Sequence, residues 1–90
     1  MTRVALGRLF ITPGARRAFD VAGEDPAAYV RRHQAGEWGE VDAEDRRAND
    51  RALRDGTRLL SAYVLGSGVR VWIITEWDRS VTTILLPEEY

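Results

Sequence analysis

Hydrophobic residues are densest in the last third of the chain, where they predict a three-stranded antiparallel meander over residues 58–86. Three runs rich in β-branched and aromatic residues are separated by two typical turn sequences: 58–65, 69–77 and 80–86, with Gly66-Ser67-Gly68 and Asp78-Arg79 between them. A sheet with one face in water alternates apolar and polar positions, but both faces of these strands are largely apolar. The pattern therefore predicts a sheet covered on both faces, either by helices or by a partner.

The loops also predict the register of these strands, because a tight turn determines which residues face each other. Placing Leu65 opposite Val69 and Trp77 opposite Ser80 divides the meander into two faces. The more uniformly apolar one is the expected core face: Leu59, Ser61, Tyr63, Leu65, Val69, Val71, Ile73, Thr75, Thr82, Ile84 and Leu86. The other mixes charge with a large aromatic residue, and we expect function there: Arg58, Leu60, Ala62, Val64, Arg70, Trp72, Ile74, Glu76, Val81, Thr83 and Leu85.

Start and stop signals upstream of the meander predict one short strand, over residues 3–11, and three helices. Capping residues, two of them followed by proline, indicate helix starts, and glycines indicate helix ends: Thr12-Pro13 to Gly23, Asp25-Pro26 to Gly36, and Asp42 to Gly56. The resulting order β-α-α-α-β-β-β predicts an α+β fold. We expect it to form a single domain over residues 1–90.

Composition excludes several classes of function. The 90 residues carry a net charge of -1, and all 13 basic residues are arginine, so the chain lacks the net basic field that non-specific binding to nucleic acid or membranes requires. No cysteine is present for a disulfide or a thiolate site. No stretch approaches the roughly 20 apolar residues of a membrane span, and the N-terminal apolar run is too short for a signal peptide. We therefore expect a complete, soluble, cytoplasmic protein.

His33 is the only histidine, and hence the first candidate for acid–base chemistry near neutral pH. It follows Tyr29 by one helical turn, a spacing that equally suits a histidine stacked or hydrogen-bonded inside the fold. The carboxylate pair Glu37 and Glu40 lacks the histidine and cysteine neighbours that are typical of metal sites. We expect no metal and no cofactor.

A second hypothesis for the charged face is that it forms part of a catalytic site. Arg58 and Arg70 share that face with Thr83, and with His33 they would supply the groups of a metal-free ribonuclease. Such a site needs arginine to stabilise the charge of a cyclising phosphate and histidine to move a proton. The alternative is that these are charged residues at strand ends and turns.

Several distinctive runs are spread over residues 33–90: His33-Gln34-Ala35-Gly36-Glu37-Trp38-Gly39-Glu40-Val41, Leu60-Ser61-Ala62-Tyr63, Trp72-Ile73-Ile74-Thr75-Glu76, Asp78-Arg79-Ser80 and Leu86-Pro87-Glu88-Glu89-Tyr90. Together they resemble an uncharacterised family of small bacterial proteins that are labelled plasmid-related or as restriction-system subunits. The resemblance implies a mobile-element setting and supplies no catalytic residues.

A histidine before a glycine-rich loop, followed by a helix and an antiparallel meander, is also similar to phage-type nuclease domains of the barnase, RelE and colicin fold group. That similarity implies His33 as acid and base, Arg58 or Arg70 as phosphate ligand, and Thr83 as a strand hydroxyl. The chain departs from the group in its acidic balance and its lack of lysine.

The leading hypothesis is a non-enzymatic accessory protein of a mobile element that acts by protein–protein binding. Its partner would be another protein or a second copy of the chain, and a homodimer is left open. The expected interface combines the charged sheet face with the Trp38 loop: Trp38, Arg58, Tyr63, Arg70, Trp72 and Glu76. The alternative function is a metal-independent ribonuclease toxin that uses His33, Arg58, Arg70 and Thr83.

Overall fold

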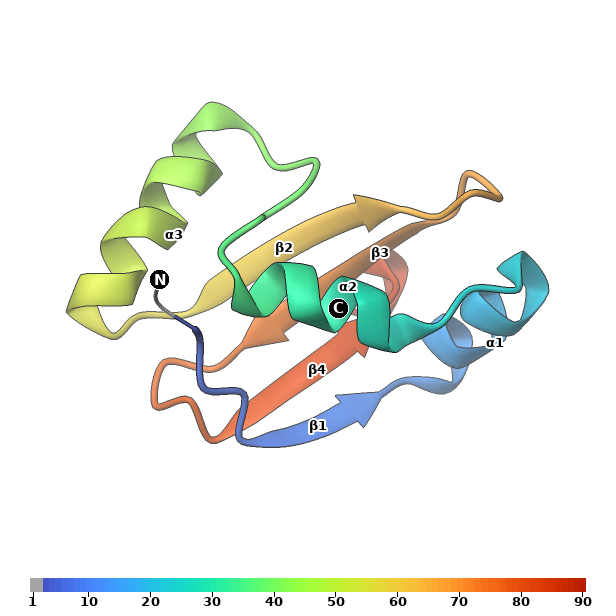
Figure 1. Cartoon of the computed structure of the whole chain (residues 1–90), viewed down its shortest axis with the longest axis horizontal. Helices are drawn as coiled ribbons and strands as arrows, with labels where there is room; N and C mark the ends of the chain where they lie inside the picture. Colours follow the sequence, from blue (N-terminus) through green and yellow to red (C-terminus); the bar gives the residue numbers. More distant parts are fainter. Residues whose placement is uncertain (1–2) are drawn as a thin grey trace.

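A computed structural model describes residues 3–90 and contains three α-helices and a four-stranded mixed sheet (Figure 1). In chain order the elements are β1 (Arg8–Ile11), α1 (Pro13–Ala22), α2 (Pro26–Gln34), α3 (Ala43–Asp55), β2 (Leu59–Val64), β3 (Arg70–Thr75), β4 (Val81–Leu85) and a short 3-10 turn, η1 (Pro87–Glu89). The α+β class and the order of strands and helices are confirmed, and η1 is additional.

The sheet corrects the expected architecture. Its strand order is β1-β4-β3-β2, and β1 pairs with β4 in parallel, so the sheet is mixed rather than a purely antiparallel three-stranded one. Parallel neighbours need a long crossover, which the three helices and the other two strands provide. Within the meander the predicted registers are confirmed, since Ile73 lies opposite Ile84 and Thr75 opposite Thr82.

The first strand is shorter than expected, because it begins at Arg8 and not at residue 3. Gly7 causes this: its φ is 64°, a left-handed conformation that interrupts a strand. A Cβ atom at Gly7 would lie 2.2 Å from the Ser80 carbonyl oxygen, so the chain passes there in backbone-to-backbone contact. Val4, freed from the strand, is buried against Trp38.

The three helices begin at the predicted capping residues and end at or near the predicted glycines, because these signals depend on residues that are close along the chain. Thr12, Asp25 and Asp42 accept a hydrogen bond from a backbone N–H in the first turn of α1, α2 and α3, respectively. Gly23 and Gly56 end α1 and α3 in the left-handed conformation. The second helix ends at Gln34, before the predicted Gly36.

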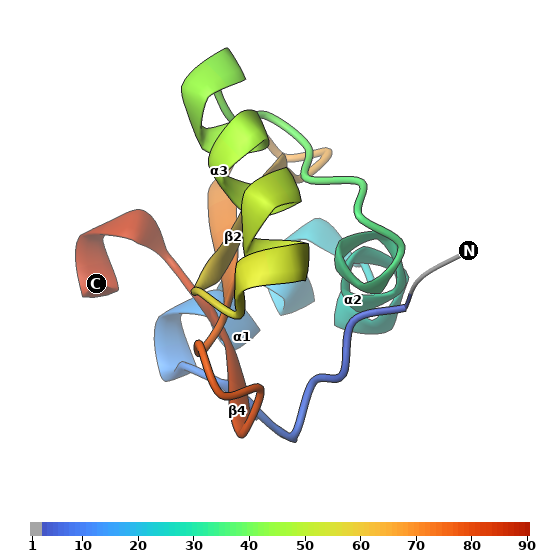
Figure 2. The ribbon, with the colours of Figure 1, turned by 90° about the vertical axis from the view of Figure 1, so that its left-hand side faces the viewer.

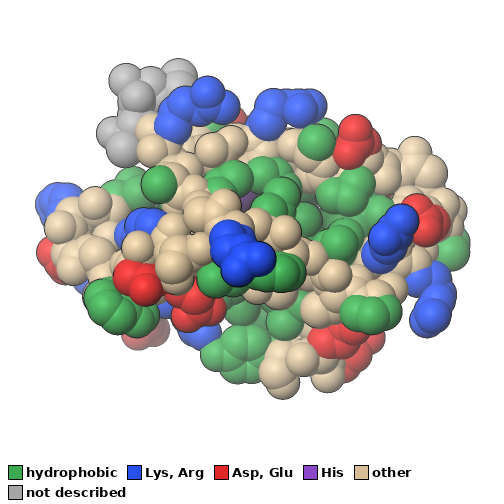
Figure 3. All heavy atoms as spheres, turned by 90° about the horizontal axis from the view of Figure 1, so that it is seen from below, with side chains coloured by type: hydrophobic (Ala, Val, Ile, Leu, Met, Phe, Trp, Pro, Cys, Tyr) green, Lys and Arg blue, Asp and Glu red, His purple; other side chains and the backbone are tan. Residues whose placement is uncertain are grey.

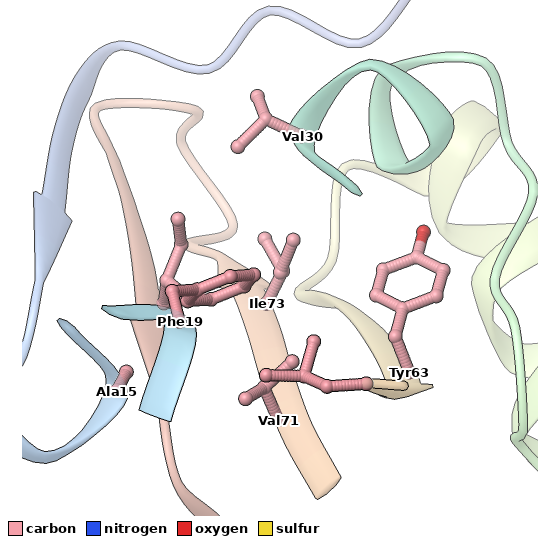
Figure 4. Packing of buried hydrophobic residues seen from close by; sticks show 8 residues of the cluster. Ala15, Phe19, Val30, Tyr63, Val71 and Ile73 are labelled. Atoms are coloured by element: carbon pink, nitrogen blue, oxygen red, sulfur yellow. The ribbon is translucent and has the colours of Figure 1, made fainter. Parts of the chain in front are cut away.

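All three helices pack through clusters of core-face residues. Phe19 of α1 and Val30 of α2 belong to one cluster with Val71 and Ile73 of the sheet (Figure 4). A second cluster joins α3 to β2 and to the segments on either side of the first two helices: Val4, Trp38, Ala52 and Leu59. Figure 2 shows the sheet nearly edge-on, with α2 on one side and the C-terminal turn on the other.

We call the second sheet face the outer face. It consists of the residues predicted for it in the meander, together with Arg8 and Phe10, which the β1–β4 register adds opposite Val81 and Thr83. The buried apolar side chains of the helices belong to the core-face clusters, whereas η1 and Tyr90 pack onto the outer face. Helices therefore cover the core face, and the outer face is the one for which the sequence left the covering open.

Arg79 connects α3 to the β3–β4 turn. Its guanidinium donates hydrogen bonds to the carbonyls of Ala52 (3.0 Å), Thr57 (2.6 Å) and Glu76 (3.1 Å). The planar fork of an arginine can serve several acceptors at once, which the compact ammonium of a lysine does not match. These contacts close the C-terminal end of α3 against the sheet.

We expect Arg79→Ala to lower the free energy of unfolding by about 2 kcal/mol, because carbonyl groups lose charge-assisted hydrogen bonds. Arg79→Lys should recover only part of this loss. Urea unfolding measures both, with Arg47→Ala on the exposed side of α3 as the control. Equal unfolding midpoints for Arg79→Ala and Arg47→Ala would show that the hydrogen bonds of Arg79 do not stabilise the fold.

Candidate functional site

His33 sits in the last turn of α2 and is fully buried against the core face of the sheet. Its Nδ1 lies 2.5 Å from Ser61 Oγ on β2, and its Nε2 lies 2.8 Å from Thr75 Oγ1 on β3. Thr75 Oγ1 is in turn 2.8 Å from Thr82 Oγ1 on β4. One polar chain therefore crosses the three strands of the meander beneath α2.

The hydrogen bond from Thr82 to the Leu6 carbonyl determines which atom is the donor in each of the other hydrogen bonds of this network. Thr82 Oγ1 donates its only proton to the Leu6 carbonyl (2.8 Å), so Thr75 must donate to Thr82. His33 Nε2 must then donate to Thr75, which leaves Nδ1 as the acceptor of the Ser61 hydroxyl. The network is thus fully satisfied by a neutral imidazole.

Burial, together with the positive charge of Arg79, lowers the pKa of His33 from 6.5 to about 4. The imidazole is consequently neutral near pH 7, has both nitrogens engaged, and does not reach solvent. The edge of the Trp38 ring packs against it, with ring centroids 5.7 Å apart. His33 holds α2 onto the sheet in this arrangement.

The structure does not bring together the four residues of the ribonuclease hypothesis. His33 lies on the core face, whereas Arg58, Arg70 and Thr83 belong to the outer face, so the sheet separates them. Arg70 Nη1 is 3.5 Å from the Glu40 carbonyl, at the β2 side of the sheet. A proton-moving group and a phosphate ligand on opposite faces cannot act on one phosphate.

The outer face carries an aromatic pair at its centre. Trp72 is half-buried and meets the Tyr90 ring edge-on, with centroids 5.8 Å apart. The Arg58 guanidinium lies 5.6 Å from the centroid of the same Tyr90 ring and donates a hydrogen bond to its hydroxyl. Trp72 and Arg58 are two rows apart on this face, with the row of Ile74 between them, and Tyr90 bridges the two.

A second aromatic group of the outer face comes from β1. Phe10 is 47% exposed and stands opposite Thr83, with the Arg8 guanidinium 5.6 Å from its ring centroid. Sequence reasoning missed Phe10 and Arg8, since the position of β1 in the sheet was not predicted. Tyr90 was missed because it follows the last predicted strand, where no strand register places its side chain on a face.

Of the six predicted interface residues, four lie on the outer face: Arg58, Arg70, Trp72 and Glu76. Trp38 and Tyr63 are each only 1% exposed and face the core. Trp38 Nε1 donates to Asp50 (3.2 Å), and the Tyr63 hydroxyl donates to the Glu37 carbonyl (2.6 Å). Both side chains fasten the loop between α2 and α3 and leave no aromatic surface there for a partner.

Two shallow hollows flank the sheet. One, of about 290 Å³, is lined by Arg32, Gly39, Glu40, Tyr63 and Val64. The other, of about 320 Å³, is mostly apolar and lies between α1 and Val69, beside η1. Across residues 3–90, no three histidine, cysteine or acidic side chains gather in a way that could hold a metal ion.

Among the described helices, none has both the length and the apolar character needed to cross a bilayer. Comparison with known proteins finds no family model, no curated relative and no solved structure that matches this chain. The mobile-element setting that the sequence resemblance implies therefore stays a prediction.

Proposed function

We propose that this chain is a non-enzymatic protein-binding module and that its outer face is the binding surface. The observation that carries the proposal is the pair Trp72 and Tyr90, which lies on a sheet face without a helix over it and is flanked by Arg58 and Arg70. Tryptophan, tyrosine and arginine are the residues that most often dominate the binding energy of protein interfaces. The surrounding apolar strand residues would exclude water around these anchors.

Charge on the outer face favours an acidic partner. Arg8, Arg58 and Arg70 are exposed there, and the strands of this face carry a single exposed carboxylate, Glu76, while η1, which packs on the same face, adds Glu88 and Glu89. Complementary charge steers association and suppresses wrong partners more than it adds affinity. The partner would therefore be a protein surface with acidic groups around an apolar centre.

The resemblance to plasmid-related proteins adds a setting to this proposal. The partner would be another protein of the same mobile element, met in the cytoplasm, and the chain would act as an accessory subunit. No cofactor or metal takes part. The distribution of His33, Arg58, Arg70 and Thr83 over two faces of the sheet gives no support to a ribonuclease, so catalysis is not part of the proposal.

Site-specific photo-crosslinking in the host bacterium tests the proposal. A photoreactive amino acid placed at Arg70, on the outer face, should give a discrete protein adduct of defined mass. The same group placed at Arg47, exposed on α3, should not. Trp72→Ala combined with Arg58→Glu should remove the Arg70 adduct, because the aromatic anchor and the charge complementarity are both lost.

Two outcomes would overturn the proposal. Equal adduct patterns at Arg70 and Arg47 would mean that the outer face has no specific partner. An Arg70 adduct that disappears on nuclease treatment would identify nucleic acid, stacked on the exposed aromatic rings, as the ligand of this face.

A further inference from the structure

The two edges of the sheet differ in how their backbone groups are satisfied. On the β2 edge, the Asn49 side chain donates to the Leu60 carbonyl (2.7 Å) and accepts from the Leu60 N–H (3.0 Å). Next to it, the Ala62 N–H donates to the Trp38 carbonyl (3.0 Å), and the Glu40 N–H donates to the Ala62 carbonyl (2.6 Å). An amide side chain and a loop thus occupy the positions of a further strand beside Leu60 and Ala62. Within residues 3–90 only Val64, at the end of β2, keeps outward backbone groups without a partner, so the middle of this edge is closed to a further strand.

The β1 edge is open. Arg8 and Thr12 donate their N–H groups to the carbonyls of Ser80 (2.9 Å) and Ile84 (3.0 Å) in the direction of β4. Because bonding direction alternates along a strand, the N–H and carbonyl groups of Leu9 and Ile11 point away from β4. Within residues 3–90 these outward groups have no hydrogen-bond partner, and Figure 1 shows no element beyond β1 on that side.

Side chains around the open edge are apolar and accessible. Leu9 is 50% and Phe10 47% exposed, although both belong to a strand of the sheet. Figure 3 views the molecule from this side and shows hydrophobic side chains gathered around the middle of the surface, beside a basic one. Proteins ordinarily protect such an edge with charge, proline, a covering segment or a very short strand, and β1 has Arg8 and its short length of four residues.

We infer that β1 pairs with β1 of a second copy of the chain, antiparallel and about a two-fold axis through Phe10. This inference is independent of the proposed function, because it concerns the edge of the sheet and not the outer face. In this register Leu9 of each copy stands opposite Ile11 of the other, and each such pair exchanges both of its outward backbone hydrogen bonds. The outward N–H and carbonyl groups of β1 in one copy can therefore all pair with the same groups in a second copy.

The same register also suits the side chains. Phe10 meets Phe10 of the second copy in a non-hydrogen-bonded pair, where Cα atoms approach to about 4.5 Å and aromatic side chains interact across strands. Arg8 stands opposite Thr12 of the second copy and diagonal to the second Phe10 ring, so the contact between Arg8 and Phe10 is extended across the axis. The two copies of Arg8 lie at opposite ends of the pairing and do not repel at close range.

Closure of the β2 edge makes the assembly a dimer and not a fibre. A sheet with two open edges can add copies without limit, whereas one open edge used about a two-fold axis is consumed by a single partner. The outer faces of both copies would then form one continuous surface.

The full chain in solution tests the inference, because it contains no cysteine and a single introduced thiol reports the register. Phe10→Cys places two thiols at a Cα separation suited to a disulfide. Under mild oxidation it should form a covalent dimer many times faster than Val64→Cys, a control of similar exposure (43%) on the closed β2 edge. Sedimentation of the wild type should give twice the 10.2 kDa chain mass.

Leu9→Pro removes an outward N–H without touching a bond to β4, since proline is tolerated on edge strands whose N–H faces solvent. This variant should sediment as a folded monomer, and Leu9→Glu, which places a charge opposite Ile11 of the second copy, should do the same. A monomeric wild type across a wide dilution series would overturn the inference. Equal oxidation rates for Phe10→Cys and Val64→Cys would also overturn it.

Discussion

Acidification from pH 6.5 to pH 4 should lower the free energy of unfolding by about 3 kcal/mol through His33 alone, since one pKa unit corresponds to about 1.4 kcal/mol. The unfolded chain binds a proton on His33 near pH 6.5, whereas the folded protein does so only near pH 4. Between these values the unfolded state holds more protons, so stability falls as the pH falls. The contribution is complete above pH 6.5, and His33 causes no further loss below pH 4.

The size of this effect has a structural cause. Protonation gives Nδ1 a hydrogen, and Ser61 must then turn from donor to acceptor inside a site where no water reaches His33. Thr75 cannot compensate, because its own proton is committed to Thr82. A charged imidazolium would thus be both desolvated and in conflict with its neighbours.

Urea unfolding at a series of pH values measures the effect, and His33→Gln is the control. The glutamine variant should be less stable at pH 7, because its amide cannot bridge Ser61 and Thr75 in the same way, but its stability should be flat between pH 6.5 and 4.5. The carboxyl groups of Glu24, Asp78 and Glu89 have lowered pKa values in the folded protein, so the stability that they add is lost as the pH falls through and below their ordinary values of 4.5, 3.8 and 4.5, mainly at the acid end of this window and beyond it. A slope retained in His33→Gln would show that another group is responsible.

Gly39→Ala should lower the free energy of unfolding by about 3 kcal/mol, because steric overlap adds to the strain of a left-handed residue. Gly39 has a φ of 76°, and a Cβ atom there would lie 2.2 Å from the Ala62 carbonyl oxygen and 2.6 Å from Cδ1 of the Tyr63 ring. To relieve the overlap, the loop must move away from β2. The bonds that Trp38 and Glu40 make with Ala62 would then be lost, and the β2 edge would open.

Gly56→Ala is the matched control for this substitution. Its φ of 70° imposes the same backbone strain, but no atom lies within 4 Å of the added Cβ. We expect it to cost about 1 kcal/mol. Thermal or urea unfolding compares the two variants, and light scattering reports whether the opened edge of Gly39→Ala promotes aggregation. Equal losses for the two variants would mean that the close approach of Gly39 to β2 is not needed.

The two faces and two edges of the sheet differ in whether the rest of the chain covers them. The core face holds the helices through the apolar clusters and the His33 network, and the β2 edge is sealed by Asn49 and the loop around Gly39. That leaves the outer face and the β1 edge as surfaces for partners. The protein-binding proposal concerns the first and the dimer proposal the second, so separate variants, at Trp72 and Leu9, can remove one without the other.

Residue patterns placed four of the six predicted interface residues on the correct face of the sheet. Arg58, Arg70, Trp72 and Glu76 were assigned to one face because alternation along a strand is local and the hairpin turns set the register. Trp38 and Tyr63 were assigned to the interface but are buried. An amphipathic aromatic side chain suits a core and an interface equally well, and only its neighbours decide between them.

Local signals in the sequence were sufficient for the three helices, their caps, the meander and its register, since each depends on residues that are close along the chain. The tertiary structure alone decided the place of β1 beside β4, the bridge of Tyr90 between Trp72 and Arg58, and the burial of His33 between Ser61 and Thr75. These contacts join segments that are far apart in sequence. Their geometry follows from how the whole chain fills its core and satisfies its buried polar groups, which no short pattern encodes.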